Sequence, residues 1–172
     1  MKTAQLERVA YHEAGHTVLA HFLCTGLATV SIVSDHESAG HTLSVDEGDP
    51  DVEQLYLTAD DAFWQRKAIV LFAGGEAVRY KWTNSRWRDG VGNDYHWAAN
   101  ALERITTDAQ AFRALHVYAS RSARLKVADY WPEIECVALA LIERKTLTAD
   151  EVKAEIWKLQ QPTEAKHWIT AA

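Results

Sequence analysis

Tyr11-His12-Glu13-Ala14-Gly15-His16 contains two histidines four positions apart, with a glutamate directly after the first. On an α-helix, residues at this spacing lie about 6 Å apart along the axis and about 40° apart around it. His12 and His16 can therefore direct a ring nitrogen at the same metal ion. Leu19 and Leu23 fall on the same side of such a helix, so both histidines are expected on its buried face.

A buried histidine pair needs polar partners, and metal ligation satisfies one nitrogen on each ring. Zinc suits the pair because it takes imidazole ligands and lowers the pKa of a bound water to about 7. Glu13 stands beside His12, where a carboxylate can take the proton of such a water and pass it to a leaving amine. The motif predicts a zinc-dependent hydrolase; the alternative for the bare pattern is a chance occurrence on an ordinary amphipathic helix.

A catalytic zinc site also needs a third protein ligand and one open position. The stretch after His16 lacks the further histidine of the extended HExxH motif, so this ligand must come from elsewhere in the chain. A residue on a rigid helix or in its first turn is favoured over a loop residue. Asp94 would stand at the positive end of a helix dipole, although it could also simply cap that helix. The candidates are His36, His41, Glu76, Asp94, His96 and Glu103.

Composition indicates one globular domain over residues 1–172, with 48% hydrophobic and 24% charged residues. The net charge of −6 and the lack of a basic run argue against a nucleic-acid partner. Cys24 and Cys136 are far apart, so we expect no structural disulfide and no cysteine-bound zinc, and a cytoplasmic location. The apolar segments are too short or too interrupted to predict a membrane span.

Helical periodicity and capping signals predict a mainly α fold. Helices are expected over about 5–25, 58–82, 94–105, 107–129 and 132–145, followed by a last helix; capping boxes are predicted at Thr58–Asp61 and at Thr148–Glu151. Between the first two helices, 29–33 and 41–45 alternate like the strands of a short hairpin. Gly74 and Gly75 lie inside a helix, where each costs about 1 kcal/mol relative to alanine, so another part of the chain is expected to pack closely there.

Four motifs follow one another along the chain: His12-Glu13-Ala14-Gly15-His16, Ala73-Gly74-Gly75-Glu76-Ala77, Gly92-Asn93-Asp94, and Leu141 to Leu147 with Glu151-Val152. In this order they resemble the peptidase domain of the FtsH-type AAA proteases, over about 5–158. The resemblance implies a zincin-like helical domain in which His12, His16 and Asp94 bind zinc and Glu13 is the catalytic base. It also implies that a strand beside the active site holds an extended substrate, at Gly40, His41, Thr42 and Leu43; an ordinary structural hairpin is the alternative.

The resulting expectation is a metallopeptidase that cuts exposed or unfolded polypeptide segments. The chain contains no Gly-rich phosphate loop followed by Lys-Ser or Lys-Thr, so we expect activity without ATP, and we expect no membrane anchor. Two alternatives remain: a catalytically weak zinc-containing module that binds peptides, and a peptidase subunit that docks on a separate ATPase. The presence of Glu13 favours catalysis over the binding module. A homo-oligomer is also compatible with the resemblance.

Two features leave the metal and the substrate pocket less defined. A set of two histidines and one carboxylate also accepts divalent ions other than zinc. Where the family commonly has acidic residues, this chain has Val78-Arg79-Tyr80, and it adds Trp82, Trp87 and Trp97. Tryptophans in a domain of this size are expected in the core or at an interface more often than in a substrate groove.

Overall fold

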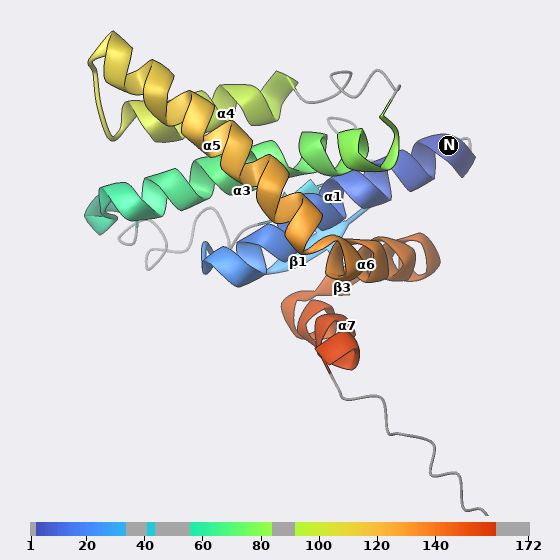
Figure 1. Ribbon diagram of the computed structural model, residues 1–172. Helices are drawn as coiled ribbons and strands as arrows, with labels where there is room; N and C mark the ends of the chain where they lie inside the picture. Colours follow the sequence, from blue (N-terminus) through green and yellow to red (C-terminus); the bar gives the residue numbers. More distant parts are fainter. Residues whose placement is uncertain (1–2, 34–40, 44–55, 84–91, 161–172) are drawn as a thin grey trace, which may run out of the picture.

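The computed structural model describes residues 3–33, 41–43, 56–83 and 92–160. The fold is mainly α with one small sheet, which confirms the predicted fold class (Figure 1). In chain order the elements are α1 (Thr3–Leu23), β1 (Thr29–Ser31), β2 (His41–Leu43), α3 (Asp61–Lys81), α4 (Gly92–Glu103), α5 (Ala109–Asp129), α6 (Trp131–Arg144), β3 (Thr146–Thr148) and α7 (Ala149–Gln160).

The α1 and α3 helices form the centre of the molecule. In addition to α3, α1 packs against α6, while α3 also contacts α4 and α5, and α5 runs diagonally across α3 (Figure 1). A Cβ added at Gly15 would lie 2.7 Å from the carbonyl oxygen of Ala73 and 2.8 Å from Cβ of Ala77. Glycine at this position therefore lets the backbone of α1 touch α3, which holds the middle of the first helix against the middle of the second.

The described elements share one hydrophobic core. Burying an aliphatic or aromatic side chain of this size contributes about 1.5–3 kcal/mol, so the helices are held mainly by their inner faces. The core receives side chains from every described helix, including Leu19, Phe72, Leu102, Val127, Ile134 and Ile156. The expectation that 1–172 forms a single domain stays a prediction.

Tyr11 ties α1 to two neighbouring helices through a polar contact inside this core. Its side chain is almost fully buried, and its hydroxyl accepts a hydrogen bond from Nζ of Lys81 at 2.7 Å and donates one to Oε1 of Glu135 at 3.2 Å. The ring stacks on Trp131 and meets Trp82 edge to face. These contacts join α1, α3 and α6 beside His12, so the orientation of the histidine turn is fixed by packing from two sides.

The sheet has three short antiparallel strands in the order β2-β1-β3. Val30 is paired with Thr42 of β2 on one side and with Leu147 of β3 on the other. The predicted pairing of 29–33 with 41–45 is therefore present; the first strand is shorter than predicted, and 44–45 lie outside the described residues. We did not predict β3, because only three residues separate α6 from the cap of α7 and their pairing with β1 is a long-range contact.

One of the two predicted capping boxes is confirmed and the other is wrong. The backbone N–H of Thr148 donates to Glu151 at 2.8 Å, and the backbone N–H of Glu151 donates to Oγ1 of Thr148 at 3.3 Å, as a capping box requires. The α3 helix, however, is capped by Asp60 and not by Thr58. The carboxylate of Asp60 accepts the backbone N–H of Phe63 at 2.8 Å, and an Asp at this place caps a helix as well as a threonine does.

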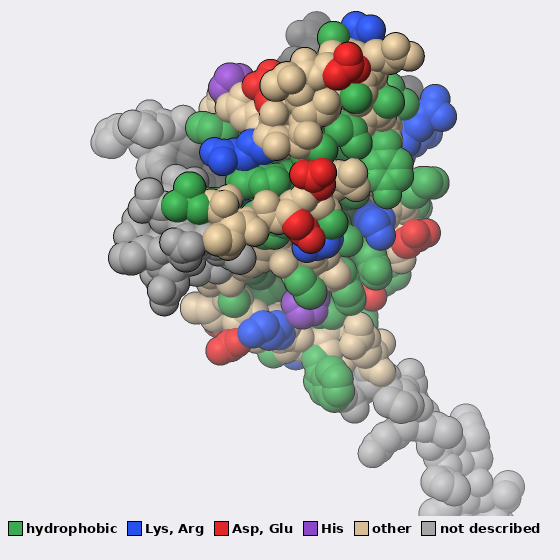
Figure 2. Space-filling model, turned by 90° about the vertical axis from the view of Figure 1, so that its left-hand side faces the viewer, with side chains coloured by type: hydrophobic (Ala, Val, Ile, Leu, Met, Phe, Trp, Pro, Cys, Tyr) green, Lys and Arg blue, Asp and Glu red, His purple; other side chains and the backbone are tan. Residues whose placement is uncertain are grey.

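The surface mixes charges of both signs with apolar groups. On the face shown in Figure 2, Lys and Arg side chains are interspersed with Asp and Glu, and exposed hydrophobic side chains lie between them. None of the described helices is both long and apolar enough to cross a membrane.

Candidate metal centre

The donor atoms of His12, His16 and Asp94 lie together where α1 and α4 meet α3. Oδ2 of Asp94 lies 3.0 Å from Nε2 of His12 and 3.5 Å from Nε2 of His16, and the two Nε2 atoms are 3.1 Å apart. Ligands about 2.0–2.1 Å from a tetrahedral zinc lie about 3.3–3.4 Å from one another, so the three atoms have nearly the spacing of three corners of such a site. Within the described residues, no other trio of His, Cys, Asp or Glu side chains converges in this way.

The protonation of the His16 ring is determined by a contact with α3. Nδ1 of His16 lies 2.8 Å from the carbonyl oxygen of Val70. A carbonyl only accepts hydrogen bonds, so Nδ1 carries the hydrogen, and the neutral ring presents a lone pair at Nε2. That lone pair lies on the side of His12 and Asp94, and a hydrogen bond from the second ring nitrogen is the usual support of a histidine that binds metal. No side-chain pattern pointed to Val70, since its contribution comes from the backbone.

Gly74 provides the space in which the two rings lie. A Cβ at this position would overlap Nε2 of His16 and would lie 2.8 Å from both Cδ2 of His16 and Cε1 of His12. The prediction that another part of the chain packs closely at the glycines of α3 is confirmed for Gly74. The groups that pack there are the imidazoles of α1, so α3 shapes the site without supplying a ligand.

The electrostatics of the trio favour a bound cation. Oδ2 of Asp94 is buried and has no hydrogen bond of ordinary geometry. Burial opposes ionisation of Asp94, but the adjacent His16 and His12 outweigh burial and hold the pKa of the carboxyl below its usual range. Burial likewise opposes charging of His16, but Asp94 and Glu13 outweigh it and raise its pKa to about 9. The donor set and the buried carboxylate therefore fit a divalent ion that replaces the proton.

Glu13 lies beside this trio. Its residue is 6% exposed, and its negative charge is close enough to His16 to favour the imidazolium form. The structure therefore places the charge of Glu13 near His16, one of the three converging residues.

Comparison with known proteins gives the relatives of this chain. The ATP-dependent zinc metalloprotease YME1 homolog of Caenorhabditis elegans is 27% identical over 91% of this chain and 26% of its own length. The ATP-dependent zinc metalloprotease FtsH 1 of Symbiobacterium thermophilum is 29% identical over 86% of this chain and 28% of its own length. The chain is related to the FtsH-type zinc metalloproteases. The relation predicted from the four ordered motifs is thereby confirmed.

The likeness concerns one part of these FtsH-type proteins. The chain spans about a quarter of the length of the two relatives named above, and the ATP-dependent zinc metalloprotease FtsH of Endomicrobium trichonymphae is 33% identical over 58% of this chain and 15% of its own length. No family model matches the chain.

The remaining candidates for the third ligand do not join the trio in the part of the chain that the structure describes. Glu76 is buried but pairs with Arg79 at 3.3 Å, and the exposed ring of His96 contacts the side chain of Asn100. Glu103 is exposed at the end of α4. His36 lies outside the described residues, and only the backbone of His41 is described.

The predicted substrate strand is described in part. Gly40 lies outside the described residues, whereas His41, Thr42 and Leu43 form β2 at the edge of the sheet, next to α1. Among the added tryptophans, Trp82 packs on Tyr11 and Trp97 is 58% exposed, while Trp87 is outside the described residues.

Proposed function

We propose that this chain is a zinc metallopeptidase that hydrolyses peptide bonds in exposed or unfolded polypeptide segments. The observation that carries the proposal is the convergence of His12, His16 and Asp94, with the lone pair of His16 directed to the other two donors. The names of the related proteins, all zinc metalloproteases, support the same metal and the same reaction.

The roles of the residues follow from their chemistry. His12, His16 and Asp94 would hold the metal. Zinc, when bound, makes water acidic and polarises a peptide carbonyl. Glu13 takes a proton at its carboxylate and delivers it to the leaving amine, so that one residue acts first as the base and then as the acid.

The edge of the sheet offers a place for the substrate backbone. Within the described residues, β2 pairs with β1 on one side and has no strand on its other side. A peptide segment in extended form can add to such an edge through main-chain hydrogen bonds, which give affinity with little selectivity for side chains. We therefore assign substrate binding to Gly40, His41, Thr42 and Leu43. A substrate segment can be bound in this way only when it is unfolded, because its main-chain N–H and C=O groups must be free to pair with β2.

Activity without ATP is part of the proposal. The 172 residues contain no phosphate-binding loop, so they have no means of using ATP to unfold a substrate. We propose as substrates the segments that are already extended or that open by local unfolding. The two cysteines of the described chain, Cys24 and Cys136, are free thiols, which suits the cytoplasm as the place of action.

The direct test compares digestion of one protein in its native form and in a reversibly destabilised form, with zinc and without ATP. We expect the destabilised form and unfolded casein to be cut and the native form to be spared, and we expect the Glu13→Gln variant to cut neither. Equal rates on both forms would contradict binding of extended segments. Peptide binding without turnover in the wild type would identify the alternative binding module, and turnover only after an ATPase is added would identify a docking subunit.

A further inference from the structure

The α5 helix carries three arginines that form no ion pair within 4 Å among the described residues, although Arg124 faces the carboxylate of Glu76 on α3. Arg113, Arg121 and Arg124 all lie on this helix, and among the described residues none of the three is within ion-pairing distance of an acidic group. On α6 and α7, by contrast, Arg144 and Lys158 both pair with Glu155. The cations of α6 and α7 are thus matched by a carboxylate inside the fold, whereas Arg113 and Arg121 of α5 have no such ion pair among the described residues.

The three arginines share one side of α5 with exposed apolar groups. At about 100° per residue, Arg113, Val117, Tyr118, Arg121, Arg124 and Leu125 fall within an arc of about 140° and span about 18 Å along the axis. We call these six residues the α5 stripe. The apolar side chains of Val117, Tyr118 and Leu125 are 51%, 55% and 66% exposed. Each therefore has apolar area that a bound partner could cover. The stripe faces outward, because the opposite side of α5 packs on α3 (Figure 1).

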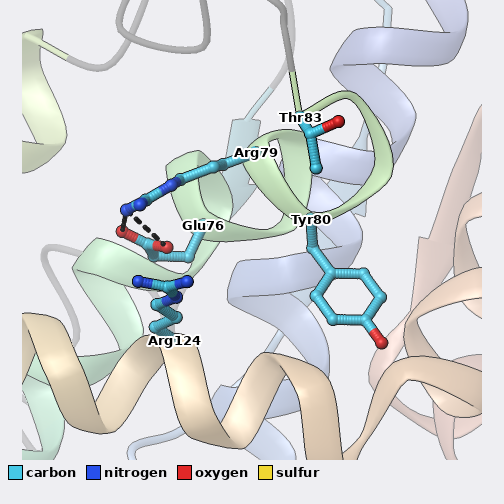
Figure 3. Close-up of a pocket in the computed structure, with 5 residues that line it drawn as sticks. All are labelled: Glu76, Arg79, Tyr80, Thr83 and Arg124. Carbon is cyan, nitrogen blue, oxygen red and sulfur yellow. Dashed lines mark hydrogen bonds and ion pairs between the residues drawn. The ribbon is translucent and has the colours of Figure 1, made fainter.

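A pocket lies where the stripe meets the end of α3. It is lined by Glu76, Arg79, Tyr80, Thr83 and Arg124 (Figure 3). The buried carboxylate of Glu76 pairs with Arg79, and the guanidinium of Arg124 points to the same carboxylate from α5 (Figure 3). Two cations therefore share one anion. The pocket keeps one excess positive charge, which a single additional carboxylate would balance.

The charge and the shape of this surface indicate the kind of partner. The chain as a whole has a net charge of −6, so a basic and apolar stripe is a local exception that favours an acidic, amphipathic ligand. Two copies of the chain joined symmetrically through the stripe would bring arginines against arginines, which disfavours a dimer of this kind. A guanidinium binds a carboxylate through two parallel hydrogen bonds, so Arg124 suits an Asp or Glu side chain that enters the pocket.

We propose that the α5 stripe docks an acidic amphipathic segment of a partner protein, with one carboxylate of that segment bound by Arg124 in the pocket. The apolar side chains of the segment cover Val117, Tyr118 and Leu125. The stripe lies on the outward side of α5, whereas the histidine rings of α1 lie against Gly74 of α3, so a partner docked on the stripe leaves the metal centre open.

The test uses the zinc-loaded chain and a fluorescent peptide of 16 residues with Glu and Leu at helical spacing, followed by anisotropy. We expect binding by the wild type that weakens as salt rises, and at least about tenfold weaker binding by the Arg113→Glu, Arg121→Glu, Arg124→Glu triple variant. Arg124→Glu alone should weaken binding about fivefold. The matched control is Lys126→Glu, a charge reversal on the same helix but outside the stripe, which should change the affinity less than twofold.

Mass spectrometry of the recovered peptide checks that it was not cut, and circular dichroism checks that the variants fold. Absence of peptide binding, or an equal loss with Lys126→Glu and Arg124→Glu, would overturn the proposal. So would binding of phosphatidylserine vesicles, or self-association in light scattering, that depends on the same arginines while the peptide does not bind. None of these outcomes depends on hydrolysis, so they leave the proposed peptidase activity as a separate question.

Discussion

Replacing Gly74 by alanine is expected to disable the metal centre while leaving the helix in place. The added Cβ would overlap Nε2 of His16 and would lie 2.8 Å from Cε1 of His12, where ordinary contacts are 3.4–4 Å. The rings would have to move by about 1 Å, roughly the difference between an overlapping and an ordinary contact. His16 cannot move freely, because its Nδ1 is held by the carbonyl of Val70 and its side chain is 8% exposed.

The size of the effect follows from the tolerance of metal sites. Ligand distances vary by only about 0.2 Å in a working site, and a displacement of about 1 Å can cost about 100-fold. Zinc at 1,000 times its Kd would stabilise the wild type by about 4.1 kcal/mol, and a 100-fold weaker site would retain about 1.4 kcal/mol. At about 2–4 °C per kcal/mol, the zinc-induced rise in Tm should fall from about 8–16 °C to about 3–6 °C.

The assay is thermal unfolding of the zinc-free and zinc-loaded forms of Gly74→Ala and two other glycine variants. Nothing lies within 4 Å of a Cβ at Gly92, so Gly92→Ala should keep both melting temperatures. A Cβ at Gly15 meets the backbone of Ala73, so Gly15→Ala should destabilise both forms by about 1–3 kcal/mol through overpacking. If Gly74→Ala shows the wild-type rise in Tm on adding zinc, the rings do not depend on that space and the reasoning is wrong.

Three further predictions concern the site and the sheet. Glu13→Gln should keep the zinc content but lower peptide hydrolysis at least about 100-fold, since general acid and base assistance supplies about 10² to 10⁴; unchanged turnover would assign the base to another group. Asp94→Asn should weaken zinc binding at least about 100-fold in a chelator competition, because the charged ligand is lost, and wild-type affinity would remove Asp94 from the ligand set. Leu147→Ala, at a fully buried position of β3, should lower the free energy of unfolding by about 2–5 kcal/mol in urea, and a loss below about 1 kcal/mol would show that β3 contributes little to the core.

The local features of the fold were predictable because their signals are local. The spacing of His12, His16 and Leu19 indicates which side of the helix 3–23 is buried. The pair Thr148 and Glu151 indicates the N-terminal cap of α7. The glycines of α3 indicated a close contact, although the sequence could not say that imidazoles make it. In each case the determining residues stand within seven positions of one another, so periodicity and capping rules apply directly.

Features that depend on residues far apart in the chain were not predictable in this way. The strand β3 exists because Leu147 pairs with Val30, more than a hundred positions away. From spacing alone, Asp94 was one of six candidates, and only the resemblance to a family singled it out. The support of His16 by Val70 involves a backbone carbonyl, which every residue has, so no side-chain pattern could reveal it.

These long-range contacts share one reference element, the α3 helix. Gly15 lets α1 approach α3 at Ala73, which brings the two histidines onto Gly74, one position further along the same helix. The helix α4, which carries Asp94 in its first turn, also packs on α3. All three donor atoms are therefore positioned against a helix that contributes no donor itself. A change of the crossing between α1 and α3 should alter the distance between the histidines and Asp94 even when every ligand is kept, so the spacing of the site reports on the packing of the core.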